Sequence, residues 1–156
     1  MAIEATKIPA KRVNFVSVKL SLVKEGSTMY AGRFINTPAE AAEFVSSHLE
    51  SDREKVLVLA LDTKNQPTSL TTVSIGDLNT APIHPREVFK TAVLSNSAAI
   101  IIAHNHPTGI TTPSKDDIKA TKRLAEAGQI LGIDLLDHII VGHNGNYTSF
   151  REQGLM

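Results

Sequence analysis

Two uninterrupted apolar runs constrain the fold of this chain more than any other feature. Residues 55–61 read KVLVLAL, and residues 98–103 read AAIIIA. A continuous apolar run of this length is typical of a β-strand that is covered on both of its faces. The two runs therefore predict central strands of one sheet, with helices packed on that sheet.

Helix and turn signals surround these two strands. The segment TPAE at 37–40 predicts a helix start, because Thr can cap the helix, Pro suits its first position and Glu can reach back to the cap. Asn144-Gly145 predicts a hairpin turn between the last two strands. The other predicted elements are strands at 16–22 and 29–34, a hairpin partner at 68–75, a helix opening at His84-Pro85, a helix from Ser114 to about Leu131 ended by Gly132, and strands at 133–141 and 147–150.

This order of elements, β-α-β-β-α-β-α-β-β, predicts an α/β fold of the mixed α+β kind, with helices packed on a mixed sheet. We expect one domain over residues 1–156, with an N-terminal strand extension at 1–36 and a core at 37–156. The exposed edge of the N-terminal strand pair could pair with a second copy, so a homodimer is one expected assembly.

Composition narrows the class of protein. Hydrophobic residues make up 42% and charged residues 21% of the 156 residues, the balance of a soluble globular domain. We expect a cytoplasmic protein, because no run approaches the roughly 20 apolar residues of a membrane span and the N-terminus is not a secretory signal. The chain has no cysteine, so any metal must be bound by His, Asp, Glu or water.

Net charge gives no general support for nucleic-acid binding. Lys plus Arg and Asp plus Glu number 16 each, whereas duplex-binding proteins usually carry a basic surface. The segment from Lys7 to Lys24 is locally basic, which is compatible with contact to nucleic acid and equally with a solvated chain end.

The segment AHNHPTGITTPSKDD at 103–117 carries the residues for chemistry. His104 and His106 stand two apart at a strand end, so both side chains leave the same face. Asp117 falls in the first turn of the helix that begins at Ser114, facing back toward the strand end. Two imidazoles and a carboxylate suit zinc, with a fourth position left for water. Ser114 and Asp117 also fit an ordinary helix cap, and the histidines fit a structural role, so the residues alone leave both interpretations open.

The spacing His104-X-His106, seven residues, Ser114, two residues, Asp117 resembles the metal motif of the JAMM (JAB/MPN) metalloproteases. HNHPTG with PSKDD, HPREVFK at 84–90 and LDHIIVG at 136–142 are closer still to the bacterial RadC-like branch, and the resemblance runs from about Glu54 to Phe150. It implies a cytidine-deaminase-like fold, one Zn²⁺ per chain on the two histidines and Asp117, and an upstream glutamate that acts on water at the metal.

Glu54, immediately before KVLVLAL, occupies the place of the family's glutamate. Its alternative interpretation is a solvated charge in the polar run 51–55. Glu87 competes for the same role, with a salt bridge or a cap as its alternative. The Ser114 hydroxyl is expected to donate to the oxyanion of the reaction.

The remaining polar residues of interest are Asp137 and the other four histidines. Asp137 could orient His104 or His106, and His138 is expected to be a core histidine or one hydrogen-bonded near the site. His48, His84 and His143 are expected to be exposed.

The resemblance implies metallopeptidase or isopeptidase chemistry on a peptide or protein substrate. A DNA-processing or DNA-repair protein, either a nuclease or an accessory factor, is the alternative, and a binding module with a structural metal is the third. RadC-like proteins usually carry an N-terminal helix-hairpin-helix domain, for which residues 1–36 are too few. We therefore expect a stand-alone catalytic domain.

Overall fold

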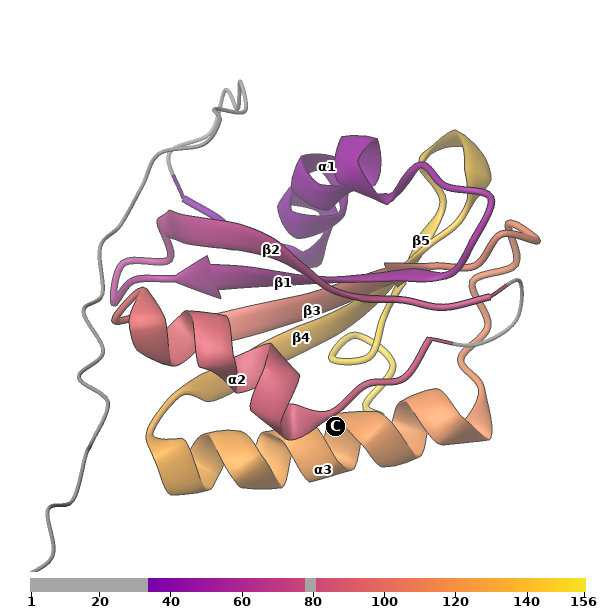
Figure 1. Cartoon of the computed structure of the whole chain (residues 1–156). Coiled ribbons are helices and arrows are strands. Elements are labelled where there is room, and N and C mark those ends of the chain that lie inside the picture. Colours follow the sequence, from indigo (N-terminus) through magenta and orange to yellow (C-terminus); the bar gives the residue numbers. More distant parts are fainter. Residues whose placement is uncertain (1–33, 78–80) are drawn as a thin grey trace, which may run out of the picture.

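A five-stranded mixed sheet with helices on both faces forms the structure, a computed structural model that describes residues 34–77 and 81–156 (Figure 1). The strand order is β2-β1-β3-β4-β5. The elements are α1 (Pro38–Leu49), β1 (Lys55–Leu61), β2 (Pro67–Ile75), α2 (Pro85–Leu94), β3 (Ala99–Asn105), α3 (Lys115–Leu131), β4 (Asp134–Val141), the short 3-10 helix η1 (His143–Gly145) and β5 (Tyr147–Ser149).

The predicted mixed α/β class is confirmed, and so is the order of elements from α1 onward. The strands predicted at 16–22 and 29–34 fall outside the described residues, apart from Phe34, and the homodimer through their edge stays a prediction. The second apolar strand is longer than predicted. It continues to Asn105 because its ladders continue on both sides, with His104 opposite Val56 and Asn105 opposite Val141.

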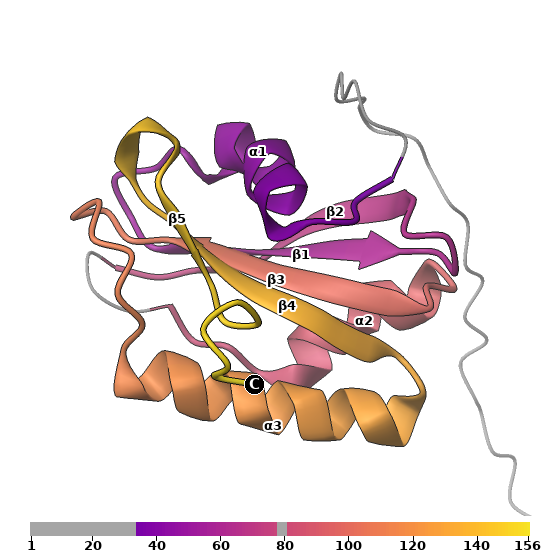
Figure 2. The same ribbon diagram turned by 180° about the vertical axis from the view of Figure 1, so that it is seen from behind.

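Side-chain alternation divides the core into two layers. On one face of the sheet, α1 packs on a cluster that includes Leu57, Leu59 and Ile101. On the other face, α2 and α3 pack on a cluster that includes Val58 and Ile102. Figures 1 and 2 show α1 on one side of the sheet and α2 with α3 on the other. Both central strands are therefore covered on both faces, as their apolar runs predicted.

Both α1 and α3 begin with a capping box, as their sequences predicted. At α1 the Thr37 hydroxyl accepts from Glu40 N at 3.2 Å, and Glu40 Oε2 accepts from Thr37 N at 3.0 Å. At α3 the Ser114 hydroxyl accepts from Asp117 N at 3.1 Å. Gly132 ends α3 at φ 68°, in the left-handed conformation that glycine adopts without steric cost. The position of Asp117 is thus fixed by the way its helix starts.

Strand directions bring distant segments to one edge of the sheet. β1 runs antiparallel to β3, and β3 runs parallel to β4. The start of β1 therefore lies beside the ends of β3 and β4, and the loop after β3 leads there into α3 (Figure 2). In the described part of the chain, no helix combines the length and the apolar character that crossing a membrane requires.

Candidate metal centre

The end of β3 positions the two histidines. His104 follows the alternation of Ile100 and Ile102, so it points to the face of the sheet that α3 covers. It is fully buried, whereas the side chain of His106, just past the strand, is 18% exposed. Their Nε2 atoms lie 3.0 Å apart. Asn105 between them points the other way, as the alternation predicted, and contacts the backbone next to β1.

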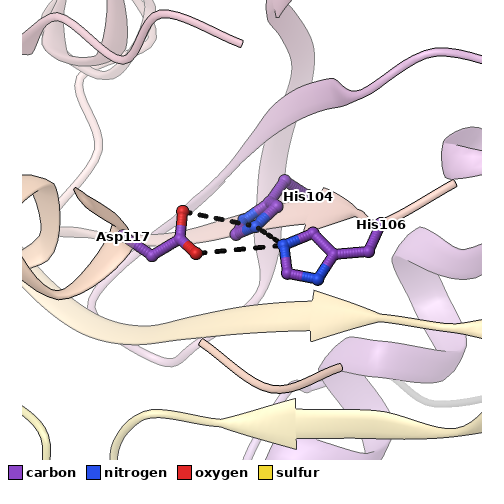
Figure 3. Close-up of side chains that lie close together, drawn as sticks. All are labelled: His104, His106 and Asp117. Atoms are coloured by element: carbon purple, nitrogen blue, oxygen red, sulfur yellow. Dashed lines mark hydrogen bonds and ion pairs between the residues drawn. The ribbon is translucent and has the colours of Figure 1, made fainter. Parts of the chain in front are cut away.

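The first turn of α3 brings a carboxylate to these two nitrogens (Figure 3). Asp117 Oδ1 lies 3.6 Å from His104 Nε2, and Asp117 Oδ2 lies 3.8 Å from His106 Nε2. Oδ2 also accepts hydrogen bonds from the Ser114 backbone N at 2.8 Å and from the Ser114 hydroxyl at 2.6 Å. The two interpretations of Ser114 and Asp117 are therefore compatible, because the helix cap itself orients the carboxylate toward the histidines.

The three side chains could hold a metal ion. One donor atom from each of His104, His106 and Asp117 lies within 4.8 Å of the others. Zinc bonds of about 2.1 Å in a tetrahedral shell put neighbouring donors about 3.4 Å apart. The two Nε2 atoms lie 3.0 Å apart, and each lies 3.6 or 3.8 Å from a different oxygen of the Asp117 carboxylate, so the spacing is close to that value. Two imidazoles and one carboxylate are also the donor types of an open zinc site, so the residues present fit the ion.

Burial keeps the His104 ring neutral, which is the form that binds a metal. Loss of hydration lowers the pKa of His104 to about 4, although the Asp117 carboxylate acts in the opposite direction. Burial likewise lowers the pKa of His138 well below its usual value. Both rings are therefore neutral near pH 7, and a neutral imidazole is the form that binds a metal.

His138, and not Asp137, is the hydrogen-bond partner of a site histidine. His104 Nδ1 and His138 Nε2 lie 2.8 Å apart, as expected of a histidine bonded near the site. The expectation that Asp137 orients His104 or His106 is wrong. Its carboxylate accepts from the Ser149 hydroxyl and two backbone N–H groups instead. Along β4, Asp137 follows the alternation of Ile139, which faces α1.

Thr121 contacts the site residues and was not predicted from the sequence. Its hydroxyl lies 2.6 Å from His138 Nδ1 and donates to the Asp117 carbonyl at 2.7 Å. The available signal was its spacing: Thr121 stands four residues after Asp117, so both lie on one face of the predicted helix.

Glu54 lies at the same edge of the sheet. The antiparallel register pairs Val56 with His104, which puts the residues before β1 beside those after β3. Glu54 is only 6% exposed, so the alternative of a solvated charge is wrong. Burial raises the pKa of the Glu54 carboxyl, while the hydrogen bond from Ala81 N at 3.1 Å and the nearby His106 act against that rise.

Glu87 and the remaining histidines lie apart from this cluster. Glu87 forms a surface salt bridge, in which Lys90 Nζ lies 2.7 Å from its carboxylate. This is the alternative interpretation that the sequence offered for Glu87. His84 and His143 are exposed as expected, whereas His48 is half-buried.

A groove of about 560 Å³ reaches His106 from solvent. The end of α1 with Ser51 and the turn between β4 and β5 contribute to its lining. That turn carries positive φ at Asn144 and Gly145, and Asn146 N donates to His143 O at 3.1 Å, which confirms the predicted hairpin turn. Of the three residues that could hold a metal, His106 is the one that lines this groove.

Comparison with known proteins identifies the family. The sequence model of the RadC-like JAB domain matches residues 35–155. The chain belongs to the RadC-like JAB domain family.

Relatives in this family include a UPF0758 protein of Desulforamulus reducens, which is 50% identical over 123 residues, or 78% of this chain and 54% of the relative. A UPF0758 protein of Clostridium botulinum (strain Okra) is 50% identical over 121 residues, which are 77% of this chain and 53% of the relative. A UPF0758 protein of Methanosarcina acetivorans is 51% identical over 107 residues, which are 69% of this chain and 46% of the relative. The chain thus spans about half the length of these curated relatives.

Proposed function

We propose that this RadC-like JAB domain is a zinc-dependent hydrolase that cleaves an amide bond in a peptide or protein substrate. The observation that carries the proposal is the convergence of His104, His106 and Asp117, with donor atoms within 4.8 Å of one another. The adjoining groove of about 560 Å³ lies within the usual range of ligand sites, about 300–1,000 Å³. Zinc, when bound, lowers the pKa of water toward about 7 and polarises a carbonyl group.

Glu54 is the proposed general base and acid. Its carboxylate takes the proton of the attacking water and returns that proton to the leaving amine nitrogen. Burial raises the pKa of this carboxyl, which strengthens it as a proton acceptor. The register of β1 against β3 supports this role, because Val56 pairs with His104 and Glu54 stands two residues before Val56.

Ser114 has a positioning role in this proposal, and its oxyanion role stays a prediction. Its hydroxyl hydrogen is directed to Asp117 Oδ2 at 2.6 Å. Donation to an oxyanion therefore requires this hydrogen to leave Asp117 when substrate binds. Loss of kcat in Ser114→Ala with an unchanged KM and unchanged metal content would support the oxyanion role.

Metal content is the first test. We expect elemental mass spectrometry of the purified protein to find about one zinc per chain, as an open three-ligand site requires. His106→Ala removes one donor and should lose the metal. A wild-type protein that takes up no metal, even when zinc is supplied at neutral pH, would contradict the proposal and favour a binding module.

Turnover is the second test, with a mixture of unstructured peptides as substrate. Glu54→Gln should retain zinc and lose about 100- to 10,000-fold in rate, because general acid–base catalysis contributes that much. Glu87→Gln is the matched control and should change neither, since Glu87 is ion-paired on the surface of α2. Unchanged turnover in Glu54→Gln would remove Glu54 from the mechanism.

A further inference from the structure

A buried chain of hydrogen bonds lies behind His104 and joins three elements. His104 Nδ1 on β3 is 2.8 Å from His138 Nε2 on β4. His138 Nδ1 is 2.6 Å from the hydroxyl of Thr121 on α3. That hydroxyl is 2.7 Å from the backbone carbonyl of Asp117. The side chains of His104, His138 and Thr121 are all 0% exposed, so water does not compete for these hydrogen bonds.

The direction of every bond in this chain follows from its last acceptor. A carbonyl oxygen only accepts, so Thr121 gives its single hydroxyl hydrogen to Asp117 O. The Thr121 oxygen must then accept from His138 Nδ1–H. A neutral imidazole carries one hydrogen, so His138 Nε2 is an acceptor and His104 Nδ1 must be the donor. The single hydrogen of His104 is thereby placed on Nδ1, and its Nε2 presents a lone pair to His106 and Asp117.

We propose that Thr121 and His138 are positioning residues that hold His104 in the tautomer whose Nε2 binds the metal. The inference rests on the proposed metal site, and it names the residues that orient His104, the most buried of the three ligands. A histidine ligand usually donates its second N–H to a carboxylate, a carbonyl or water. Here the acceptor is a neutral histidine, which can present either a lone pair or an N–H. Thr121 is the residue that decides between the two.

Phe150 packs on the His138 ring, and the hydrogen-bond network links two residues of the site. Phe150 stacks on the His138 ring with centroids 4.5 Å apart and planes inclined by 20°, which fixes the plane of the ring. The chain also begins and ends on site residues, because Asp117 supplies both the last carbonyl and a carboxylate ligand atom. If His138 carried its hydrogen on Nε2, His104 would carry its own on Nε2 and could not bind a metal there.

Thr121→Val tests the inference with little change of shape. The variant leaves His138 Nδ1–H without an acceptor and so favours the other tautomer. We expect zinc affinity, measured by competition with a chelator, to fall about 10- to 100-fold, the usual cost of losing an outer partner of a ligand. Thr121→Ser returns the hydroxyl and should restore the affinity.

Ser149→Ala is the matched control. It removes another buried hydroxyl bond of 2.6 Å, to Asp137, without touching the chain behind His104. It should leave zinc affinity unchanged, and thermal unfolding of the metal-free variants shows which of them are folded. A folded Thr121→Val variant that binds zinc as tightly as the wild type would overturn the inference and leave the proposed function standing.

Ring tautomers give a readout that needs neither metal nor activity. In two-bond ¹H–¹⁵N correlation spectra of the metal-free wild type, we expect His138 to carry its hydrogen on Nδ1. A hydrogen on His138 Nε2 would overturn the inference. Failure of the wild type to bind zinc would instead refute the proposed function, and the spectra would still decide which tautomers the chain imposes.

Discussion

Asn105 holds the backbone that carries Glu54. Its Oδ1 accepts from Lys55 N at 2.9 Å, and its Nδ2 donates to Arg53 O at 2.9 Å. These two groups flank Glu54 on either side, and Asn105 itself is only 6% exposed. The residue between the two histidines therefore couples the end of β3, where the metal ligands lie, to the segment that carries the proposed base.

Asn105→Ala should lower turnover without removing zinc. The backbone groups of Lys55 and Arg53 lose their partner, so we expect a loss of about 1–3 kcal/mol in the free energy of unfolding. Turnover should fall because Glu54 is no longer held, while zinc stays bound to His104 and His106. Urea unfolding, metal content and peptide turnover measure the three effects. Wild-type turnover in a folded Asn105→Ala protein would show that Glu54 does not depend on this contact.

The buried histidines should make the metal-free protein sensitive to acid. Burial lowers the pKa of His104 to about 4 and that of His138 well below its usual range. Below about pH 6.5 the unfolded chain binds protons at both rings that the folded chain does not. The free energy of unfolding should therefore fall with pH, by up to about 1.4 kcal/mol per pH unit for each ring, until the pH passes the folded pKa.

Urea unfolding of metal-free Glu54→Gln between about pH 7 and about pH 5 measures this slope. The substitution removes the Glu54 carboxyl, whose raised pKa would change stability in the opposite direction. A stability that does not fall over this range would show that the folded protein binds protons at these two rings as readily as the unfolded chain does.

At the scale of elements, the two capping boxes allow a matched comparison. Thr37 and Ser114 start α1 and α3 with the same pair of hydrogen bonds. Replacing either by Ala should lower the free energy of unfolding by about 1 kcal/mol. Only Ser114→Ala also removes the 2.6 Å bond to Asp117 Oδ2, so only this variant should lose zinc affinity. Chelator competition on both variants checks this, and equal affinities would mean that the cap does not orient the carboxylate.

Local signals predicted the elements well, because each depends on neighbours in sequence. The apolar run at β1 and the caps of α1 and α3 are of this kind. Asp137 shows where such signals stop. The pairing of β3 with β4 shifts between Leu135 and Asp137, so alternation places Leu135 toward α2 and α3 but Asp137 toward α1. Without this irregularity Asp137 would stand on the face of His104, and a β-bulge of this type has no local signature here.

At the scale of the whole molecule, the site depends on how strands pair. The spacing of His104, His106 and Asp117 within one strand-loop-helix segment made their convergence predictable from sequence. The position of Glu54 needed the antiparallel pairing of β1 with β3. The link from Thr121 to His138 needed the packing of α3 against β4, which sequence patterns do not specify.

The last prediction concerns nucleic-acid binding, the alternative function, and it follows from the net charge of the chain. Sixteen basic and sixteen acidic residues balance, whereas affinity for DNA comes largely from cations that neutralise phosphates. We expect no binding of a labelled duplex at micromolar protein and physiological salt, measured by fluorescence anisotropy. Residual affinity at low salt should come from the basic segment of Lys7, Lys11, Arg12, Lys19 and Lys24 and should vanish when these are replaced by Gln.

The salt dependence gives this prediction a numerical limit. Five cations that neutralise five phosphates give a slope of log affinity against log salt no steeper than about −4.5. A steeper slope, or binding that survives the five replacements, would require a further cationic surface formed by the folded part of the chain. That result would favour DNA processing over peptide cleavage, because a basic patch on one face is the electrostatic footprint of nucleic-acid binding.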